Sequence, residues 1–250
     1  MQNFWLTLLI ALQFLTKIPI TLSALPTARQ NALALLWYPW VGLLIGGVLW
    51  LIACVSTLPI MVLSALIVLA WVWLTGGLHL DGLADTADGF VGGHGDKTRT
   101  LAIMKDPNCG AMGVMAIVLC LMLKWSSVYA LLAMQQPWLL LLVPVFGRLA
   151  ILGLFLTTPY VRAHGLGASL ANFLPKVWAW VMLIVGLLGG GIAVLLGSSP
   201  IKAIRLLGIF VITLAYLRYI FCQKINGITG DTVGASVEII EITILLAYLA

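Results

Sequence analysis

Long apolar runs separated by short polar stretches dominate this chain. The stretch from Gln30 through Leu80 contains no aspartate, glutamate, lysine or arginine. A helix needs about 20 apolar residues to cross the hydrocarbon core of a bilayer, so this stretch alone predicts two spans. The same pattern along the whole chain predicts about eight hydrophobic segments, at residues 4–22, 33–56, 60–80, 111–133, 138–157, 177–197, 203–222 and 229–250. The first of these either spans or is re-entrant.

The composition agrees with this pattern. Hydrophobic residues make up 62% of the 250 residues and charged residues only 8%, whereas soluble domains average about 25% charged residues. We therefore expect an all-α, polytopic integral membrane helical bundle with about seven or eight hydrophobic segments. It forms a single membrane-embedded domain over residues 1–250. The lipid bilayer is the expected surrounding, and nucleic acid is not an expected partner because the sequence has no basic run.

Three of the eight acidic residues follow directly on an apolar run, as Asp81, Asp85 and Asp88. Their offsets of four and three place all three carboxylates on one face of a helix. Clustered like charges repel one another unless a cation lies among them. The alternative is a solvated helix end or loop, but solvation alone does not explain why so acid-poor a chain concentrates its acids on one face.

A second acidic block lies near the end of the chain. Asp231, Glu238 and Glu241 are offset by seven and three, again on one helical face, and no acidic residue lies between residues 107 and 230. A carboxylate in mid-membrane costs about 2.5–3.5 kcal/mol, so Glu238 and Glu241 should face the bundle interior or a cation. Clustered carboxylates without a histidine or cysteine set favour Mg²⁺ or Mn²⁺ over zinc.

Two basic residues lie inside predicted spans. Arg148 either snorkels to an interface or pairs with the carboxylates or a phosphate, and the same two readings apply to Lys124. His79 precedes the first acidic block and is either a hydrogen-bonded structural group or a residue that supports the site or acts as a base.

The loops around residues 81–110, 158–176 and 218–234 hold most of the lysine and arginine, and they lie on one side if each intervening pair of segments spans. The positive-inside rule makes that side cytoplasmic. Both acidic blocks belong to it. The residues alone therefore predict a metal–carboxylate site at the cytoplasmic boundary, flanked by basic residues and suited to phosphate chemistry. The loop at residues 160–167 is either a substrate loop or a connector.

Five motifs in order resemble the cobalamin-5′-phosphate synthase (adenosylcobinamide-GDP ribazoletransferase) family. They are Gly76-Gly77-Leu78-His79-Leu80-Asp81-Gly82-Leu83-Ala84-Asp85-Thr86-Ala87-Asp88-Gly89, Ile103-Met104-Lys105-Asp106 with Gly110-Ala111-Met112-Gly113, Gly147-Arg148, Tyr160-Val161-Arg162 with Gly165-Leu166-Gly167, and Thr229-Gly230-Asp231-Thr232-Val233-Gly234-Ala235 with Glu238. One departure is Pro107-Asn108, where the family often has Ser-Arg.

The resemblance implies a Mg²⁺-dependent, multi-pass enzyme of the bacterial inner membrane whose active site faces the cytoplasm. It would join adenosylcobinamide-GDP to α-ribazole or its 5′-phosphate, giving cobalamin or its phosphate and GMP. It leaves open which acceptor is used, the number of metal ions, and whether the chain forms a homo-oligomer or associates with other cobalamin-pathway enzymes.

The resemblance also implies roles for individual residues. Glu238 or Glu241 would be the base, while Arg148 and Lys105 would offset the charge of the pyrophosphate. The predicted metal ligands are Asp81, Asp85, Asp88 and Asp231. The predicted substrate-binding residues are His79, Arg99, Asp106 and Arg162; Arg99 or Lys105 would replace the arginine that Asn108 lacks.

Two other functions compete with this one. A CDP-alcohol phosphotransferase would have an aspartate three positions before Asp81 and an arginine after Ala84, and this chain has neither. A cation transporter would carry its acids at mid-membrane in broken helices, often within inverted repeats. Here Asp81 to Asp88 follow the end of a predicted span, and no such repeat is evident.

Overall fold

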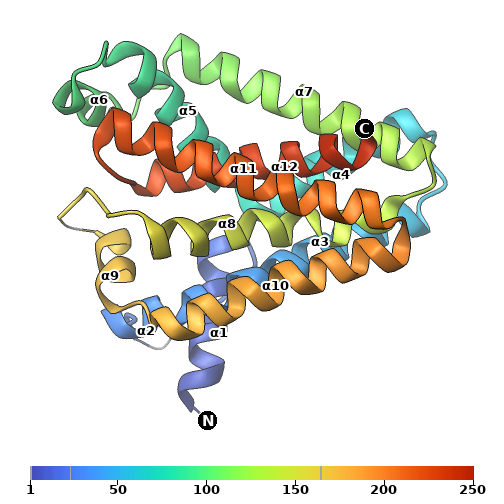
Figure 1. The fold of residues 1–250 in the computed structure, drawn as a ribbon, viewed down its shortest axis with the longest axis horizontal. Helices are drawn as coiled ribbons and strands as arrows, with labels where there is room; N and C mark the ends of the chain where they lie inside the picture. The colour runs from blue at the N-terminus through green and yellow to red at the C-terminus, as the bar shows by residue number, and fades with distance from the viewer. Residues whose placement is uncertain (1, 23, 164) are drawn as a thin grey trace.

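The computed structural model describes residues 2–22, 24–163 and 165–250. Within them the chain is helical, and the only β pairing is an isolated bridge between Tyr160 and Ile228. Figure 1 shows the helices in their chain order. Their bounds are α1 Gln2–Leu15, α2 Ala28–Ala34, η1 Leu35–Trp37, α3 Tyr38–Val55, α4 Ile60–Thr75, α5 Leu78–Gly92, α6 Lys97–Ile103, α7 Ala111–Ala133, η2 Pro137–Leu141, α8 Val143–Thr157, α9 Leu166–Phe173, α10 Lys176–Gly197, α11 Pro200–Ile225 and α12 Gly230–Leu249.

The expected all-α membrane bundle is confirmed. Six helices of the described chain are long and apolar enough to cross a membrane, and a seventh span is formed if α4 and α5 count as one. That pair corrects the prediction of one continuous span over residues 60–80, because α4 ends at Thr75 and α5 leaves it at 88°. The break falls at Gly76 and Gly77, whose φ angles of 63° and 71° lie in the left-handed region that glycine adopts readily.

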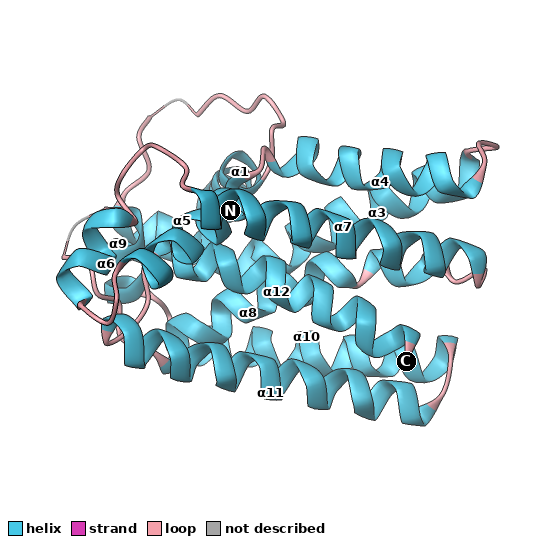
Figure 2. Ribbon diagram, turned by 90° about the horizontal axis from the view of Figure 1, so that it is seen from above, coloured by secondary structure: helices cyan, strands magenta, loops and turns pink. Residues whose placement is uncertain are grey.

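Helices α8 and α12 form the centre of the bundle. In the most apolar part of each, 78% of the residues are buried, compared with 28% for α7 and α10 and 22% for α11. The outer helices thus carry the lipid-facing apolar surface, and Figure 2 shows them ranged around the two central ones. Glycines permit close packing here: a Cβ added at Gly42 of α3 would lie 2.6 Å from the Pro144 carbonyl oxygen.

The charged loops gather at one end of the bundle, as predicted. Figures 1 and 2 place α6 and α9 together at that end, away from the turns that join α3 to α4 and α10 to α11. The bridge between Tyr160 and Ile228 ties the loop after α8 to the loop before α12. The start of α12, which carries Asp231, is therefore held beside the loop after α8.

Candidate active site

Helix α5 presents the first acidic block. The stretch is helical from Leu78 to Gly92, as the spacing of its carboxylates predicts. Asp81 lies in the first turn, where a negative charge complements the helix dipole. The Asp81 side chain is exposed, whereas the neighbouring Leu80 and Leu83 are buried against the bundle. Packing of the apolar side therefore leaves the acidic side turned toward the charged end.

Asp231 joins this group because α5 and the start of α12 are in close contact. Thr229 caps α12, and its hydroxyl accepts the Thr232 N–H in a capping box. A Cβ added at Gly82 would lie 2.7 Å from the Asp231 carbonyl oxygen, so glycine allows the two helices to meet. The negative charges of Asp81, Asp231 and Asp88 all act on the Asp85 carboxyl, so Asp231 lies with the first acidic block, whereas Glu238 and Glu241 of the second block do not.

Arg162 supplies a positive charge to this group. Its Nη2 donates to Asp231 Oδ2 at 2.6 Å and to the Met104 carbonyl at 3.4 Å. Both side chains are partly exposed, at 24% for Arg162 and 19% for Asp231. The predicted substrate-binding arginine therefore lies at the acidic site, and the loop that carries it is more than a connector. His164 of this loop lies outside the described residues.

Asp88 has a structural role that its sequence position did not reveal. Its Oδ2 accepts the Gly110 N–H at 2.7 Å and its Oδ1 accepts the Gly113 N–H at 2.9 Å. These amides open α7, so the carboxylate caps a helix from another part of the chain. The backbone amides of this glycine pair thus both donate to Asp88.

The oxygen atoms of these carboxylates are donors of the kind that magnesium binds. The convergent side chains offer carboxylate oxygens, which hard divalent cations prefer. No group of three or more histidine, cysteine or acidic side chains in the described residues is arranged to hold an ion by itself. Magnesium is commonly held by one or two carboxylates together with substrate phosphates and water, so this incomplete set of ligands is of the kind it uses.

Glu238 and Glu241 lie in a separate ion network inside the bundle. Lys124 Nζ lies 2.7 Å from Glu238 Oε2 and 2.5 Å from Glu241 Oε2, and Arg148 Nη1 also donates to Glu241. All four side chains are nearly inaccessible, with Arg148 at 0% exposure. The glutamates thus face the interior, as predicted. Arg148 and Lys124 pair with them instead of snorkelling.

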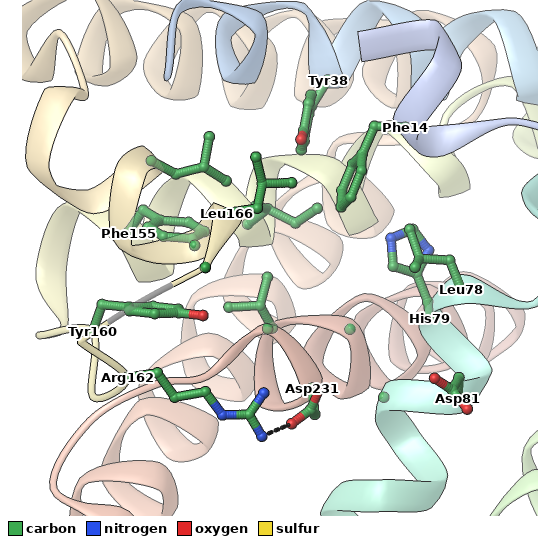
Figure 3. Close-up of a pocket in the computed structure, with 18 residues that line it drawn as sticks. Phe14, Tyr38, Leu78, His79, Asp81, Phe155, Tyr160, Arg162, Leu166 and Asp231 are labelled. Atoms are coloured by element: carbon green, nitrogen blue, oxygen red, sulfur yellow. Dashed lines mark hydrogen bonds and ion pairs between the residues drawn. The ribbon is translucent and has the colours of Figure 1, made fainter. Parts of the chain in front are cut away.

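A cavity beside the acidic group has a volume of about 290 Å³. Figure 3 shows Tyr38, Phe14, Phe155 and Tyr160 around it, with Asp81 and the Arg162–Asp231 pair along its edge. His79 also lines it. Burial raises the pKa of the Tyr160 phenol above its usual value.

A second cavity of about 560 Å³ adjoins the first. It is more open and is lined by Lys17, Thr75 and the Gly76–Gly77 break. The two cavities share Phe14, Leu78 and Asp81. Asp81 is therefore the acidic side chain common to both.

Several predicted site residues do not line the first cavity. Glu238, Glu241 and Arg148 lie in the buried network, and Lys105, Arg99 and Asp106 are exposed on or after α6. The backbone N–H of Asn108, together with its side-chain amide, holds the pKa of Asp106 below its usual value. Conversely, the sequence did not single out Phe14, Tyr38 or Phe155. Only the loop motif at residues 160–167 pointed to Tyr160.

Comparison with known proteins shows which family this sequence resembles. A family model described as cobalamin-5-phosphate synthase matches residues 7–249. A protein of Acinetobacter baumannii is 49% identical over 99% of this chain and 97% of its own length. Relatives in Pseudomonas fluorescens and Stutzerimonas stutzeri are 47% and 48% identical, each covering 96% of this chain and at least 96% of their own. All three are named adenosylcobinamide-GDP ribazoletransferase.

No solved structure matches this chain. The family model covers nearly all of the sequence, and the relatives match it over nearly their whole length. The motifs of both acidic blocks fall within the matched region. The chain therefore belongs to the cobalamin-5-phosphate synthase family.

Proposed function

We propose that this chain transfers the adenosylcobinamide-phosphate group of adenosylcobinamide-GDP to α-ribazole or α-ribazole 5′-phosphate. One observation supports this most directly: Asp81, Asp231 and Arg162 lie at the edge of one cavity at the charged end of the bundle. Such a site offers oxygen ligands and a cation beside an apolar binding space. These are the elements that phosphoryl transfer requires.

The reaction is a substitution at phosphorus. A ribazole hydroxyl oxygen attacks the phosphorus on the cobinamide side of the pyrophosphate, and a P–O bond forms. The bond from that phosphorus to the bridging oxygen breaks, and GMP leaves with its electron pair. The hydroxyl proton passes to a carboxylate of the protein.

Asp81 is the proposed acceptor of that proton. It borders both cavities, so it can contact a hydroxyl bound in one while the pyrophosphate occupies the other. Glu238 and Glu241 were the bases expected from the sequence. Their carboxylates pair with Lys124 and lie away from the cavity. We therefore propose that they stabilise the folded bundle and take no part in proton transfer.

Magnesium is the proposed cofactor, with Asp85 and Asp231 as its protein ligands. When bound, it would neutralise the negative charge of the pyrophosphate. Arg162 holds Asp231 in place and faces the same anionic group. Asp88 serves the site indirectly, because it fixes the start of α7 beside α5.

The proposed location is the bacterial inner membrane, with the site facing the cytoplasm. The support is the concentration of lysine and arginine in the loops at the end that carries the acids. A cysteine-accessibility test with a membrane-impermeant thiol reagent on Cys109, which is exposed beside Asp88, would check this orientation. In a Cys54→Ala variant, which lacks the other exposed cysteine of the described residues, Cys109 should be labelled in inverted vesicles and not in intact spheroplasts.

The decisive experiment is incubation of the purified protein with adenosylcobinamide-GDP, Mg²⁺ and each acceptor in turn. We expect a cobalamin product and one GMP released per product formed. Parallel reactions with CDP-diacylglycerol and an alcohol, and ion-flux measurements in liposomes, test the competing functions. Release of CMP, or ion flux without GMP release, would overturn the proposal.

A further inference from the structure

We propose that the aromatic cavity binds the base of the ribazole acceptor and directs its ribose toward Asp81. This inference rests on the proposed function, because it assigns one of the two substrates to one of the two cavities. Ribazole is a nucleoside whose base, dimethylbenzimidazole, is a flat, uncharged, two-ring aromatic group. The walls of the cavity match that chemistry.

Two stacked aromatic pairs form much of the wall. The rings of Phe155 and Tyr160 have centroids 5.9 Å apart with an interplanar angle of 12°. Those of Phe14 and Tyr38 are 6.1 Å apart at 19°. Figure 3 shows the two pairs on different sides of the space, with Leu166 between them. Flat aromatic ligands gain stacking energy against such faces in addition to the burial of their apolar area.

The charged side chains of the cavity are grouped along one edge. Asp81, Asp231 and Arg162 lie there, opposite Tyr38 in Figure 3. The remaining lining is largely apolar and includes Ile151, Leu166 and Leu170. A ligand with an apolar ring at one end and hydroxyl groups at the other fits only one way round. Its ribose therefore meets the carboxylates.

The size of the cavity separates the two substrates. Ligand sites commonly measure about 300–1,000 Å³, and a cavity of about 290 Å³ suits a nucleoside. A corrinoid carrying a nucleotide is several times larger and cannot enter it. The donor must reach Asp81 from the other side, where the second, more open cavity and Lys17 lie.

The first test compares Michaelis constants for the two substrates. Phe155→Leu keeps an apolar side chain of similar size but removes the ring. We expect it to raise KM for ribazole by about tenfold through lost stacking, with KM for adenosylcobinamide-GDP changing by less than about twofold. Tyr160→Leu should act in the same way. Tyr160→Phe keeps the ring, so its KM for ribazole should equal that of the unmodified enzyme. Phe173→Leu is the matched control, because Phe173 ends α9 with its side chain 54% exposed and does not line the cavity.

The second test needs no variant and so does not depend on how a variant folds. Free 5,6-dimethylbenzimidazole should inhibit the unmodified enzyme in competition with ribazole and not in competition with adenosylcobinamide-GDP. Ribose 5-phosphate, which lacks the base, should inhibit far more weakly. Competition with the donor instead would overturn the inference.

The outcomes also separate this inference from the proposed function. Absence of GMP release from the unmodified protein would refute the function itself. Normal GMP release with an unchanged KM for ribazole in Phe155→Leu and Tyr160→Leu would refute only the assignment of the cavity. Size-exclusion profiles and thermal unfolding of each variant show whether a raised KM comes from a folded protein.

Discussion

Lys124 on α7 and Glu241 on α12 form a buried ion pair, with Nζ 2.5 Å from Oε2. Glu238 and Arg148 complete the network, and Lys124 also lies 4.4 Å from the centre of the Trp71 ring. Two positive and two negative charges thus balance inside the bundle. Burial is tolerable because each charge has an opposite partner.

Removing one partner should therefore be costly. Lys124→Met leaves two glutamates facing one arginine, and we expect a loss of about 3–5 kcal/mol in the free energy of unfolding. Thermal unfolding in detergent measures this loss of stability. Lys105→Met, at an exposed lysine, is the control and should change stability little. The double variant Lys124→Met/Glu238→Gln restores charge balance and should be more stable than Lys124→Met; equal stability would contradict the explanation.

Asp85→Asn should abolish transfer while leaving the protein folded and inserted. The amide removes the negative charge proposed to hold the metal but keeps the shape of the side chain. GMP release over a Mg²⁺ titration measures the effect. Asp96→Asn is the matched control, because Asp96 caps α6 and asparagine caps as well as aspartate. Near-normal activity of Asp85→Asn at saturating Mg²⁺ would refute the metal assignment.

Variants of Asp88 test whether its carboxylate caps α7 or binds the metal. Asp88→Ala removes the acceptor for the Gly110 and Gly113 amides and should lower stability by about 1–2 kcal/mol. Asp88→Asn keeps one acceptor oxygen and should lose less. If capping is the main role, Asp88→Asn leaves the Mg²⁺ concentration for half-maximal rate unchanged. A large rise in that concentration would instead make Asp88 a metal ligand.

Arg162→Gln should lower kcat/KM by about 10- to 100-fold, the range expected when a hydrogen bond to a charged group is lost. The substitution frees Asp231 from its partner and removes the cation beside the site. Arg218→Gln is the control, since Arg218 is exposed and donates to the Thr157 carbonyl away from the acids. Equal losses in the two variants would show that the effect is a general loss of positive charge.

Gly82→Ala should separate α5 from α12. Its Cβ would lie 2.7 Å from the Asp231 carbonyl oxygen, and such overpacking costs about 1–3 kcal/mol. Because the shift also moves the two acidic blocks apart, activity should fall together with stability. Gly208→Ala in α11 meets no atom within 4 Å and should be neutral or stabilising. Unfolding curves and GMP release, measured on both proteins, show whether stability and activity fall together in Gly82→Ala alone.

The sequence by itself determined the helical membrane architecture, the helical face of Asp81, Asp85 and Asp88, and the gathering of charged loops at one end. These properties depend on local quantities, namely apolar length, helical period and the distribution of lysine and arginine. Burial of Glu238 and Glu241 followed in the same way, because a carboxylate in an apolar helix must find a partner.

Only the tertiary structure decided which of these groups share a space. The cavity takes Phe14 from α1, Tyr38 from α3 and Phe155 from α8, and along the chain such aromatics look no different from residues that face lipid. The cap that Asp88 provides for α7 likewise depends on a neighbour distant in sequence. Packing, which joins residues far apart along the chain, placed Asp81 at the edge of an aromatic cavity and left Glu238 and Glu241 in a closed ion network.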